Sequence, residues 1–126
     1  MRAIVDASFL MRSVELGRDL IEAVSERLGE PVVPYTVPQV LEELRRLSSG
    51  RGVKAIRVRA ALKVARGIEV VEVGERDAPA DRVLVELSRQ RGDIVLTSDL
   101  GVMRAVLRRG GRAALVTEEG EVKLVL

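Results

Sequence analysis

Short runs of β-branched and aliphatic residues alternate with longer stretches of helical periodicity along this chain of 126 residues. Strands separated by helices of ten or more residues imply β-α-β units, and such units build a mainly parallel sheet. The short runs are apolar throughout, as strands that are covered on both faces require. We therefore predict an α/β fold in three layers, with a single domain over residues 1–126.

The expected elements follow from the apolar runs and from the glycines that end helices. Gly17 is expected to break the first helix, and Thr36 to cap the helix that begins at Pro38. The expected strands are residues 3–5, 31–35, 68–73, 94–97 and 113–116, with 122–126 as a possible edge strand. The expected helices are residues 9–28, 38–50, 53–65, 79–90 and 100–109.

The composition excludes several kinds of chemistry. The chain has no cysteine and no histidine, which rules out disulfide scaffolds, Ser–His triads and zinc sites with Cys or His ligands. Aromatic residues make up only 2% of the chain, which argues against RNA recognition by base stacking. Any catalysis must therefore depend on carboxylates, Lys, Arg, hydroxyls or a metal held by oxygen.

The expected cellular location follows from the absence of membrane-spanning and signal-peptide patterns in the sequence. It has no apolar run of about 18 residues, so no membrane span is expected. The first six residues, MRAIVD, become acidic too soon for a signal peptide. We therefore expect a cytoplasmic protein.

Four acidic residues are placed to meet at one edge of the predicted sheet. Asp6 follows the first strand, and Asp99 follows the strand at 94–97. Glu43 and Asp81 lie in the first turns of helices that begin at the same edge. In open α/β sheets, ligands bind outside the carboxyl ends of the strands, so all four carboxylates are expected to share one pocket.

Four carboxylates in one pocket repel each other unless a cation or protons are bound. Mg²⁺ and Mn²⁺ prefer oxygen ligands, and either ion can generate a hydroxide nucleophile and stabilise charge on a phosphate. Each acid also has a purely structural interpretation: Asp6 and Asp99 as helix caps, Asp81 as a first-turn acid and Glu43 as a solvated surface residue. The joint placement of the four favours a metal site for phosphodiester cleavage.

Basic residues follow two of these acids. Residues 44–67 contain no acid, and a second group of arginines at 104–112 follows Asp99. Such surfaces bind phosphate backbones, although a solvated helix face is the alternative interpretation. The candidate RNA-binding residues are Arg45, Arg46, Arg51, Lys54, Arg57 and Lys63.

Four segments resemble, in order, the motifs of the PIN domain family. They are residues 4–10 (IVDASFL), 37–47 (VPQVLEELRRL), 80–82 (ADR) and 94–99 (IVLTSD). The resemblance aligns Glu43, rather than Glu42, with the acidic ligand of the second motif. It departs from the common pattern at Ala7, where Thr is usual, and at Ser98, where Asn is usual.

The resemblance implies a Rossmann-like, five-stranded sheet of order 3-2-1-4-5 and cleavage of single-stranded RNA. It implies that Asp6 and Asp99 hold the metal directly and that Glu43 and Asp81 complete the site, directly or through water. Ser8, Thr97 and Ser98 would orient ligands or solvent. The segment from residue 47 to 73 is most similar to archaeal PIN proteins, either rRNA-processing endonucleases of the small subunit or VapC-type toxins. Ribosome-assembly factors, a cognate antitoxin or a second copy in a homodimer are therefore expected partners.

Two other classes of function remain open. A catalytically weak PIN-fold protein would bind RNA as a scaffold, although the presence of all four acids argues against it. A phosphoacceptor receiver domain also places acids at the edge of a parallel sheet. That class needs an Asp at the end of the strand at 68–73, where this chain has none before Asp77.

Overall fold

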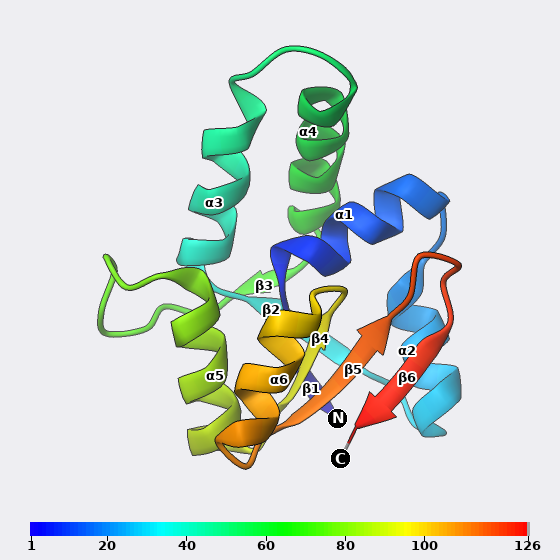
Figure 1. Ribbon diagram of the computed structural model, residues 1–126, viewed down its shortest axis with the longest axis vertical. Helices are drawn as coiled ribbons and strands as arrows, with labels where there is room; N and C mark the ends of the chain where they lie inside the picture. The colour runs from blue at the N-terminus through cyan, green and yellow to red at the C-terminus, as the bar shows by residue number, and fades with distance from the viewer. Residues whose placement is uncertain (126) are drawn as a thin grey trace.

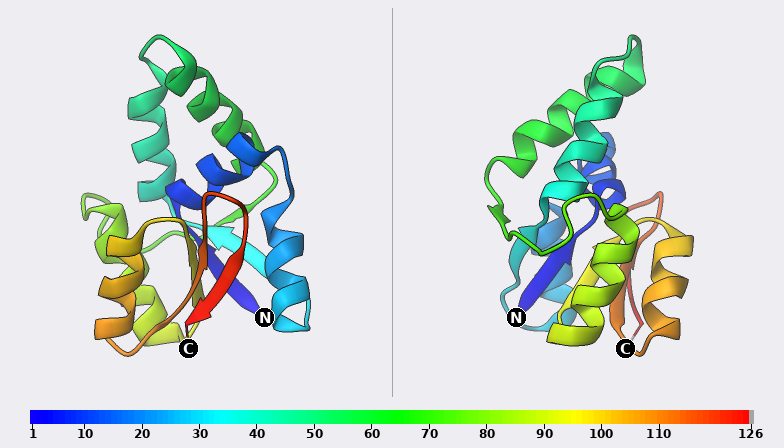
Figure 2. Two further views of the ribbon diagram at one scale, coloured as in Figure 1. Left: turned by 45° about the vertical axis from the view of Figure 1, so that its right-hand side comes forward. Right: turned by 90° about the vertical axis from the view of Figure 1, so that its left-hand side faces the viewer.

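The computed structural model describes residues 1–125, which form one sheet with helices on both of its faces (Figure 1). Helices α5 and α6 cover one face, and α2 lies on the other (Figure 2). The strands are β1 (Arg2–Val5), β2 (Val33–Thr36), β3 (Glu69–Val70), β4 (Ile94–Thr97), β5 (Arg112–Val116) and β6 (Val122–Val125). The helices are α1 (Ala7–Leu16), α2 (Leu20–Leu28), α3 (Pro38–Ser48), α4 (Val53–Ala65), α5 (Ala80–Arg91) and α6 (Leu100–Arg108).

The strand order is β3-β2-β1-β4-β5-β6, which confirms the predicted order of the first five strands. All neighbouring strands are parallel except β6, which pairs antiparallel with β5. The sheet therefore has six strands rather than five, and the possible edge strand predicted at 122–126 is β6. The last residue of that prediction lies outside the described residues. Because β1 is central, its end is flanked by helices that begin after several other strands.

The core lies between the sheet and the helices on each face. Ile4 of β1 is fully buried and pairs with Tyr35 of β2 and Val95 of β4. Leu44 of α3 and Leu84 of α5 are also fully buried. Burial of a Leu or Ile side chain contributes about 1.5–3 kcal/mol, so this layer fixes the relative positions of the elements that carry the acids.

The first predicted helix is broken where the sequence predicted. Gly17 has φ of 61°, a left-handed conformation that Gly adopts at little cost, and its N–H bonds to carbonyls of α1. Helix α2 then begins after Asp19, which accepts a hydrogen bond from the N–H of Glu22. The predicted helix at 9–28 is therefore two helices, α1 and α2, which run in different directions (Figure 1).

Two local predictions were wrong. Thr36 does not cap α3: it is the last residue of β2, and its Oγ1 donates to the carbonyl of Val5 at 2.9 Å. Val37 takes the cap position without a side-chain hydrogen bond. The strand predicted at 68–73 is only two residues long, and both are exposed. β3 is an edge strand, so it lacks the covered faces that its apolar sequence suggested.

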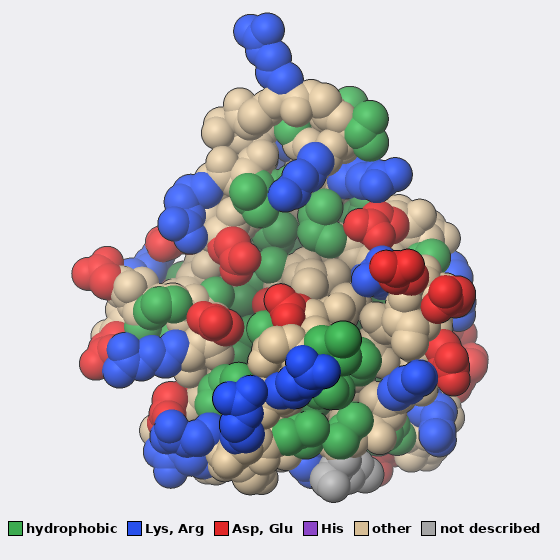
Figure 3. All heavy atoms as spheres, viewed as in Figure 1, with side chains coloured by type: hydrophobic (Ala, Val, Ile, Leu, Met, Phe, Trp, Pro, Cys, Tyr) green, Lys and Arg blue, Asp and Glu red, His purple; other side chains and the backbone are tan. Residues whose placement is uncertain are grey.

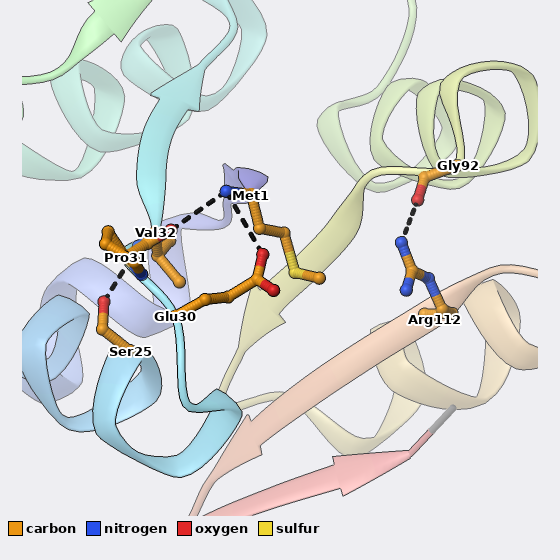
Figure 4. A network of polar contacts seen from close by, with 7 residues as sticks. All are labelled: Met1, Ser25, Glu30, Pro31, Val32, Gly92 and Arg112. Atoms are coloured by element: carbon orange, nitrogen blue, oxygen red, sulfur yellow. Dashed lines mark hydrogen bonds and ion pairs between the residues drawn. The ribbon is translucent and has the colours of Figure 1, made fainter.

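Polar contacts link the chain at the amino-terminal ends of the parallel strands (Figure 4). The amino group of Met1 donates to the carbonyl of Pro31 at 2.9 Å and lies 3.5 Å from the carboxylate of Glu30. Arg112 donates to the carbonyl of Gly92 at 2.6 Å. These contacts involve backbone carbonyls and chain ends, so we interpret this edge as structural.

The helices α3 and α4 form a hairpin, residues 38–65, which we call the helical arm. The arm projects beyond the carboxyl ends of the parallel strands and contacts α1, while the start of β1 and the end of β6 lie at the opposite end of the molecule (Figures 1 and 2). Within residues 1–125, no helix is both long and apolar enough to cross a bilayer.

Candidate functional site

The four predicted acids lie together. Asp6 follows β1, Glu43 lies on α3, Asp81 is in the first turn of α5, and Asp99 is the cap residue of α6. All four line one cavity of about 320 Å³, which we call the acidic pocket. The other lining residues are Ser8, Arg46, Pro79, Ala80 and Val102. The side chains therefore come from four elements that meet at the carboxyl edge of the sheet.

Asp6 is held rigidly. Only 6% of the residue is exposed, and its backbone N–H donates to the carbonyl of Leu96, which fixes the end of β1 against β4. Its Oδ1 accepts a hydrogen bond from the N–H of Ala7 at 2.8 Å, so it caps α1. Its Oδ2 accepts from Ser8 Oγ at 2.9 Å and from Thr97 Oγ1 at 2.8 Å. The structural interpretation of Asp6 as a cap is correct, but it does not account for the position of Asp6 in the pocket.

Thr97 connects the two aspartates across the sheet. Its fully buried Oγ1 donates to Asp6 and accepts from the backbone N–H of Asp99 at 3.0 Å. Ser8 Oγ lies 3.0 Å from the same hydroxyl and accepts from the N–H of Ser98 at 2.9 Å. Thr97 and Ser8 therefore contact Asp6 directly, and their role in orienting ligands or solvent stays a prediction. The Ser98 hydroxyl does not share them, because its Oγ is buried and has no hydrogen-bond partner among the described residues.

Asp99 is exposed and only partly committed to the backbone. Its Oδ1 accepts from the N–H of Gly101 at 2.7 Å and of Val102 at 3.3 Å, which caps α6. Its Oδ2 accepts no hydrogen bond from residues 1–125 and stays available for a ligand. Asp81 is likewise exposed, with Oδ1 accepting from the N–H of Arg82 at 3.0 Å. Each of these aspartates thus has one oxygen to offer.

The structure separates the two neighbouring glutamates of α3. Glu43 lines the acidic pocket, whereas Glu42 is not among the residues that line it. Glu42 instead lies 3.5 Å from Nε of Arg76, which is on the loop before α5. The placement agrees with the alignment that selected Glu43 as the acidic residue of the second motif.

The carboxylates in the pocket oppose one another electrostatically. Burial raises the pKa of Asp6 above its ordinary value of 3.8; the hydrogen bonds from Thr97 and Ser8 offset part of this rise, and the charge of Asp99 adds to it. Burial also raises the pKa of Glu43 above 4.5, with further contributions from Asp6, Asp81 and Asp99. The carboxylates of Asp6 and Glu43 therefore hold a proton more tightly than free carboxylates do.

The donor set fits a hard divalent cation, although it is not a closed cage. Among residues 1–125, no three acidic side chains are arranged so that they could hold one ion together. Mg²⁺ usually keeps several of its waters and is bound through one or two carboxylates, so a closed protein cage is not required. The oxygens of Asp6, already oriented, and the open oxygen of Asp99 suit direct contacts, and Glu43 and Asp81 suit contacts through water.

The predicted basic residues lie on the helical arm. Arg45 and Arg46 are on α3, Arg51 is in the turn, and Lys54, Arg57 and Lys63 are on α4. All six are exposed. Figure 3 shows basic side chains along the arm and acidic side chains grouped below its base. Arg46 reaches the acidic pocket itself, where its charge lowers the pKa of Glu43.

Sequence reasoning missed residues next to the pocket. Gln39 was interpreted only as part of a helix motif, yet it is 4% exposed and donates to the carbonyl of Glu75 at 2.8 Å. Arg76 lies outside the acid-free stretch and was passed over, although it faces α3. The available signal for Gln39 was its position one turn before Glu43 on the same helix. Nothing in the sequence indicated that the loop holding Arg76 would fold back on α3.

Comparisons with known proteins agree with the geometry. A family model described as "PIN like domain" matches residues 3–119. The solved structure of the PIN domain endonuclease Utp24 has a TM-score of 0.76 and 22% identity, covering 99% of this chain and 96% of that one. A domain of a functionally unknown protein from Methanocaldococcus jannaschii DSM 2661 has a TM-score of 0.63 and 23% identity, covering 99% and 98%. A comparison with curated proteins found no match.

The match to the family model extends over nearly the whole chain and includes all four acids of the pocket. The solved structures have the same fold over their full lengths. The receiver-domain alternative is therefore not supported. On this match, the chain belongs to the PIN-like domain family.

Proposed function

We propose that the protein is a Mg²⁺- or Mn²⁺-dependent endoribonuclease that hydrolyses phosphodiester bonds of single-stranded RNA. The observation that carries the proposal is the acidic pocket, where Asp6, Glu43, Asp81 and Asp99 meet beside an exposed arginine, Arg46. Membership of the PIN-like family and the fold shared with a PIN domain endonuclease support it. The chain has no histidine, so acid–base chemistry with imidazole is not available.

Each residue in the pocket has a distinct task in this proposal. When bound, a divalent cation supplies a hydroxide nucleophile at neutral pH and offsets negative charge on the phosphate. Asp6 and Asp99 would hold the cation, and Glu43 and Asp81 would hold its waters. The hydroxyls of Thr97 and Ser8 lower the pKa of Asp6 and so favour the ionised form that binds metal. Arg46 would contact the phosphate.

The basic helical arm would bind the RNA on one side of the pocket. Its exposed Arg and Lys side chains form a surface that contacts phosphates without reading the sequence. Cleavage of single-stranded RNA is compatible with both roles inferred from the sequence. An rRNA-processing enzyme and a toxin of a toxin–antitoxin pair both act by cutting RNA.

A pair of matched variants tests the proposal. Asp6 and Asp19 both cap helices, but only Asp6 lines the acidic pocket. Asn is also a good cap residue, so Asp6→Asn and Asp19→Asn are both expected to fold. Cleavage of a single-stranded RNA in Mn²⁺ is expected to fall roughly 100-fold or more in Asp6→Asn and to stay near wild type in Asp19→Asn.

Two results would count against the proposal. Undiminished cleavage by Asp6→Asn would remove Asp6 from the mechanism. RNA binding by the wild type without any cleavage that depends on Mn²⁺ and stops with EDTA would favour the scaffold alternative, a PIN-fold protein that binds RNA and does not cut it.

A further inference from the structure

We propose that a second cavity beside the acidic pocket binds the nucleotide next to the scissile phosphate. We call this cavity the arginine pocket. It is lined by Gln39, Glu42, Arg45, Arg46, Arg76 and Asp77, with residues 78–80 forming one wall. The inference rests on the proposed function, because it assigns part of the substrate of the same enzyme.

The two pockets are adjacent. Arg46, Pro79 and Ala80 line both of them, so a chain that leaves the acidic pocket past Arg46 enters the arginine pocket. The arginine pocket has a volume of about 530 Å³, within the range of small-ligand sites. It lies between α3 and the loop before α5, on the side where the helical arm begins.

The charges of the two pockets are opposite. The acidic pocket has four acids and one arginine, whereas the arginine pocket has three arginines and two acids. Arg76 lies 3.5 Å from Glu42 and 3.4 Å from Glu72, but its side chain is 56% exposed. Ion pairs this exposed contribute little, so Arg76 can exchange them for a phosphate. A phosphate of the neighbouring nucleotide is therefore the anion that this pocket suits.

Gln39 provides an independent indication of a ligand. Gln39 lines the arginine pocket and is nearly fully buried, and its Oε1 is closed off from solvent with no hydrogen-bond partner among the described residues. The bond from Nε2 to the carbonyl of Glu75 fixes which end of the amide is the oxygen. A buried acceptor without a donor destabilises the fold, and such groups are uncommon in native proteins. The Gln39 amide would turn toward the pocket to accept from a ribonucleotide, which supplies donors of two kinds, the ribose 2′-hydroxyl and the N–H groups of the bases.

The phosphate contact is tested with metal-free protein. In EDTA the RNA is not cut, and the binding of a fluorescent single-stranded 12-nucleotide RNA is measured by anisotropy across a range of salt concentrations. Arg76→Gln is compared with Arg89→Gln, which removes another exposed arginine that pairs with a glutamate but lies outside both pockets. Arg76→Gln is expected to weaken binding about tenfold and to reduce the salt slope by about 0.7. Equal effects of the two variants would overturn the proposal.

The role of Gln39 is tested with Gln39→Met, which keeps the length of the side chain and removes the amide. Wild type and variant are titrated with the 12-nucleotide RNA and with DNA of the same sequence. A weaker affinity of Gln39→Met for RNA alone supports the pocket and assigns the 2′-hydroxyl as donor. Equally weakened affinities for RNA and DNA support the pocket and assign a base. Unchanged affinities for both would overturn the assignment of Gln39.

The outcomes separate this inference from the proposed function. If Asp6→Asn abolishes cleavage while Arg76→Gln and Gln39→Met bind and cut RNA like wild type, the nuclease stands and the arginine pocket is overturned. Thermal unfolding of each variant shows whether it is folded, and Arg76, being exposed, can be replaced even where Gln39 cannot.

Discussion

Replacement of Thr97 tests whether its buried hydroxyl stabilises the fold and orients the carboxylate of Asp6 in the acidic pocket. Thr97→Val keeps the shape of the side chain and removes its hydroxyl. The variant loses a hydrogen bond to the carboxylate of Asp6, and hydrogen bonds to charged groups contribute about 1.5–3 kcal/mol. It also leaves the backbone N–H of Asp99 without its acceptor. Together we expect the free energy of unfolding to fall by about 2–4 kcal/mol.

Thr97→Ser is the matched control, because it keeps the hydroxyl and loses only a buried methyl group, a change of about 1 kcal/mol. Urea denaturation in EDTA measures both variants. The hydroxyl of Thr97 also lowers the pKa of Asp6, so its loss raises that pKa further and moves the pH midpoint of Mn²⁺ binding upward. Equal stabilities of Thr97→Val and Thr97→Ser, together with an unshifted pH midpoint, would show that the Thr97 hydroxyl neither stabilises the fold nor affects Asp6.

Two further predictions follow from the same structure. In EDTA the folded protein holds protons on Asp6 and Glu43 more tightly than the unfolded chain does, so stability falls as pH rises from about 4 through their raised pKa values. Saturating Mn²⁺ should abolish this decline, as urea titrations from pH 4 to 8 would detect; stability that rises over this range in EDTA would contradict it. Gly111→Ala places a methyl group against the Ser88 hydroxyl and 2.8 Å from Val106 Cγ1, and we expect thermal unfolding to report a loss of about 1–3 kcal/mol. An unchanged melting temperature would exclude this steric conflict.

Much of the fold follows from local patterns in the sequence. The strands β1, β4 and β5 are short, apolar and central, so their composition alone indicates that both faces are covered. The break at Gly17 follows from the backbone freedom of glycine, and the structure places it in the left-handed conformation. The acids converge because the ends of parallel strands share an edge, a rule that needs no side-chain detail.

The errors arise where long-range contacts determine the outcome. Thr36 lies just before a predicted helix, where a capping residue is common. Its hydroxyl instead donates a hydrogen bond to the carbonyl of Val5 on the neighbouring strand. The length of β3 depends on how much of it pairs with β2, which its own residues do not specify. Arg76 and Gln39 come together only because the loop before α5 folds against α3. No periodic pattern of apolar and polar residues in the sequence predicts any of these contacts.

In the proposed mechanism, the acidic pocket binds a divalent cation through Asp6 and Asp99, and Glu43 and Asp81 hold its waters. A crystal soaked with Mn²⁺ and measured at the manganese absorption edge tests it directly. We expect an anomalous peak in the pocket at roughly 2 Å from oxygens of Asp6 and Asp99, with Glu43 and Asp81 close by. A saturating soak that gives no peak there, or a peak bound only elsewhere on the surface, would contradict it.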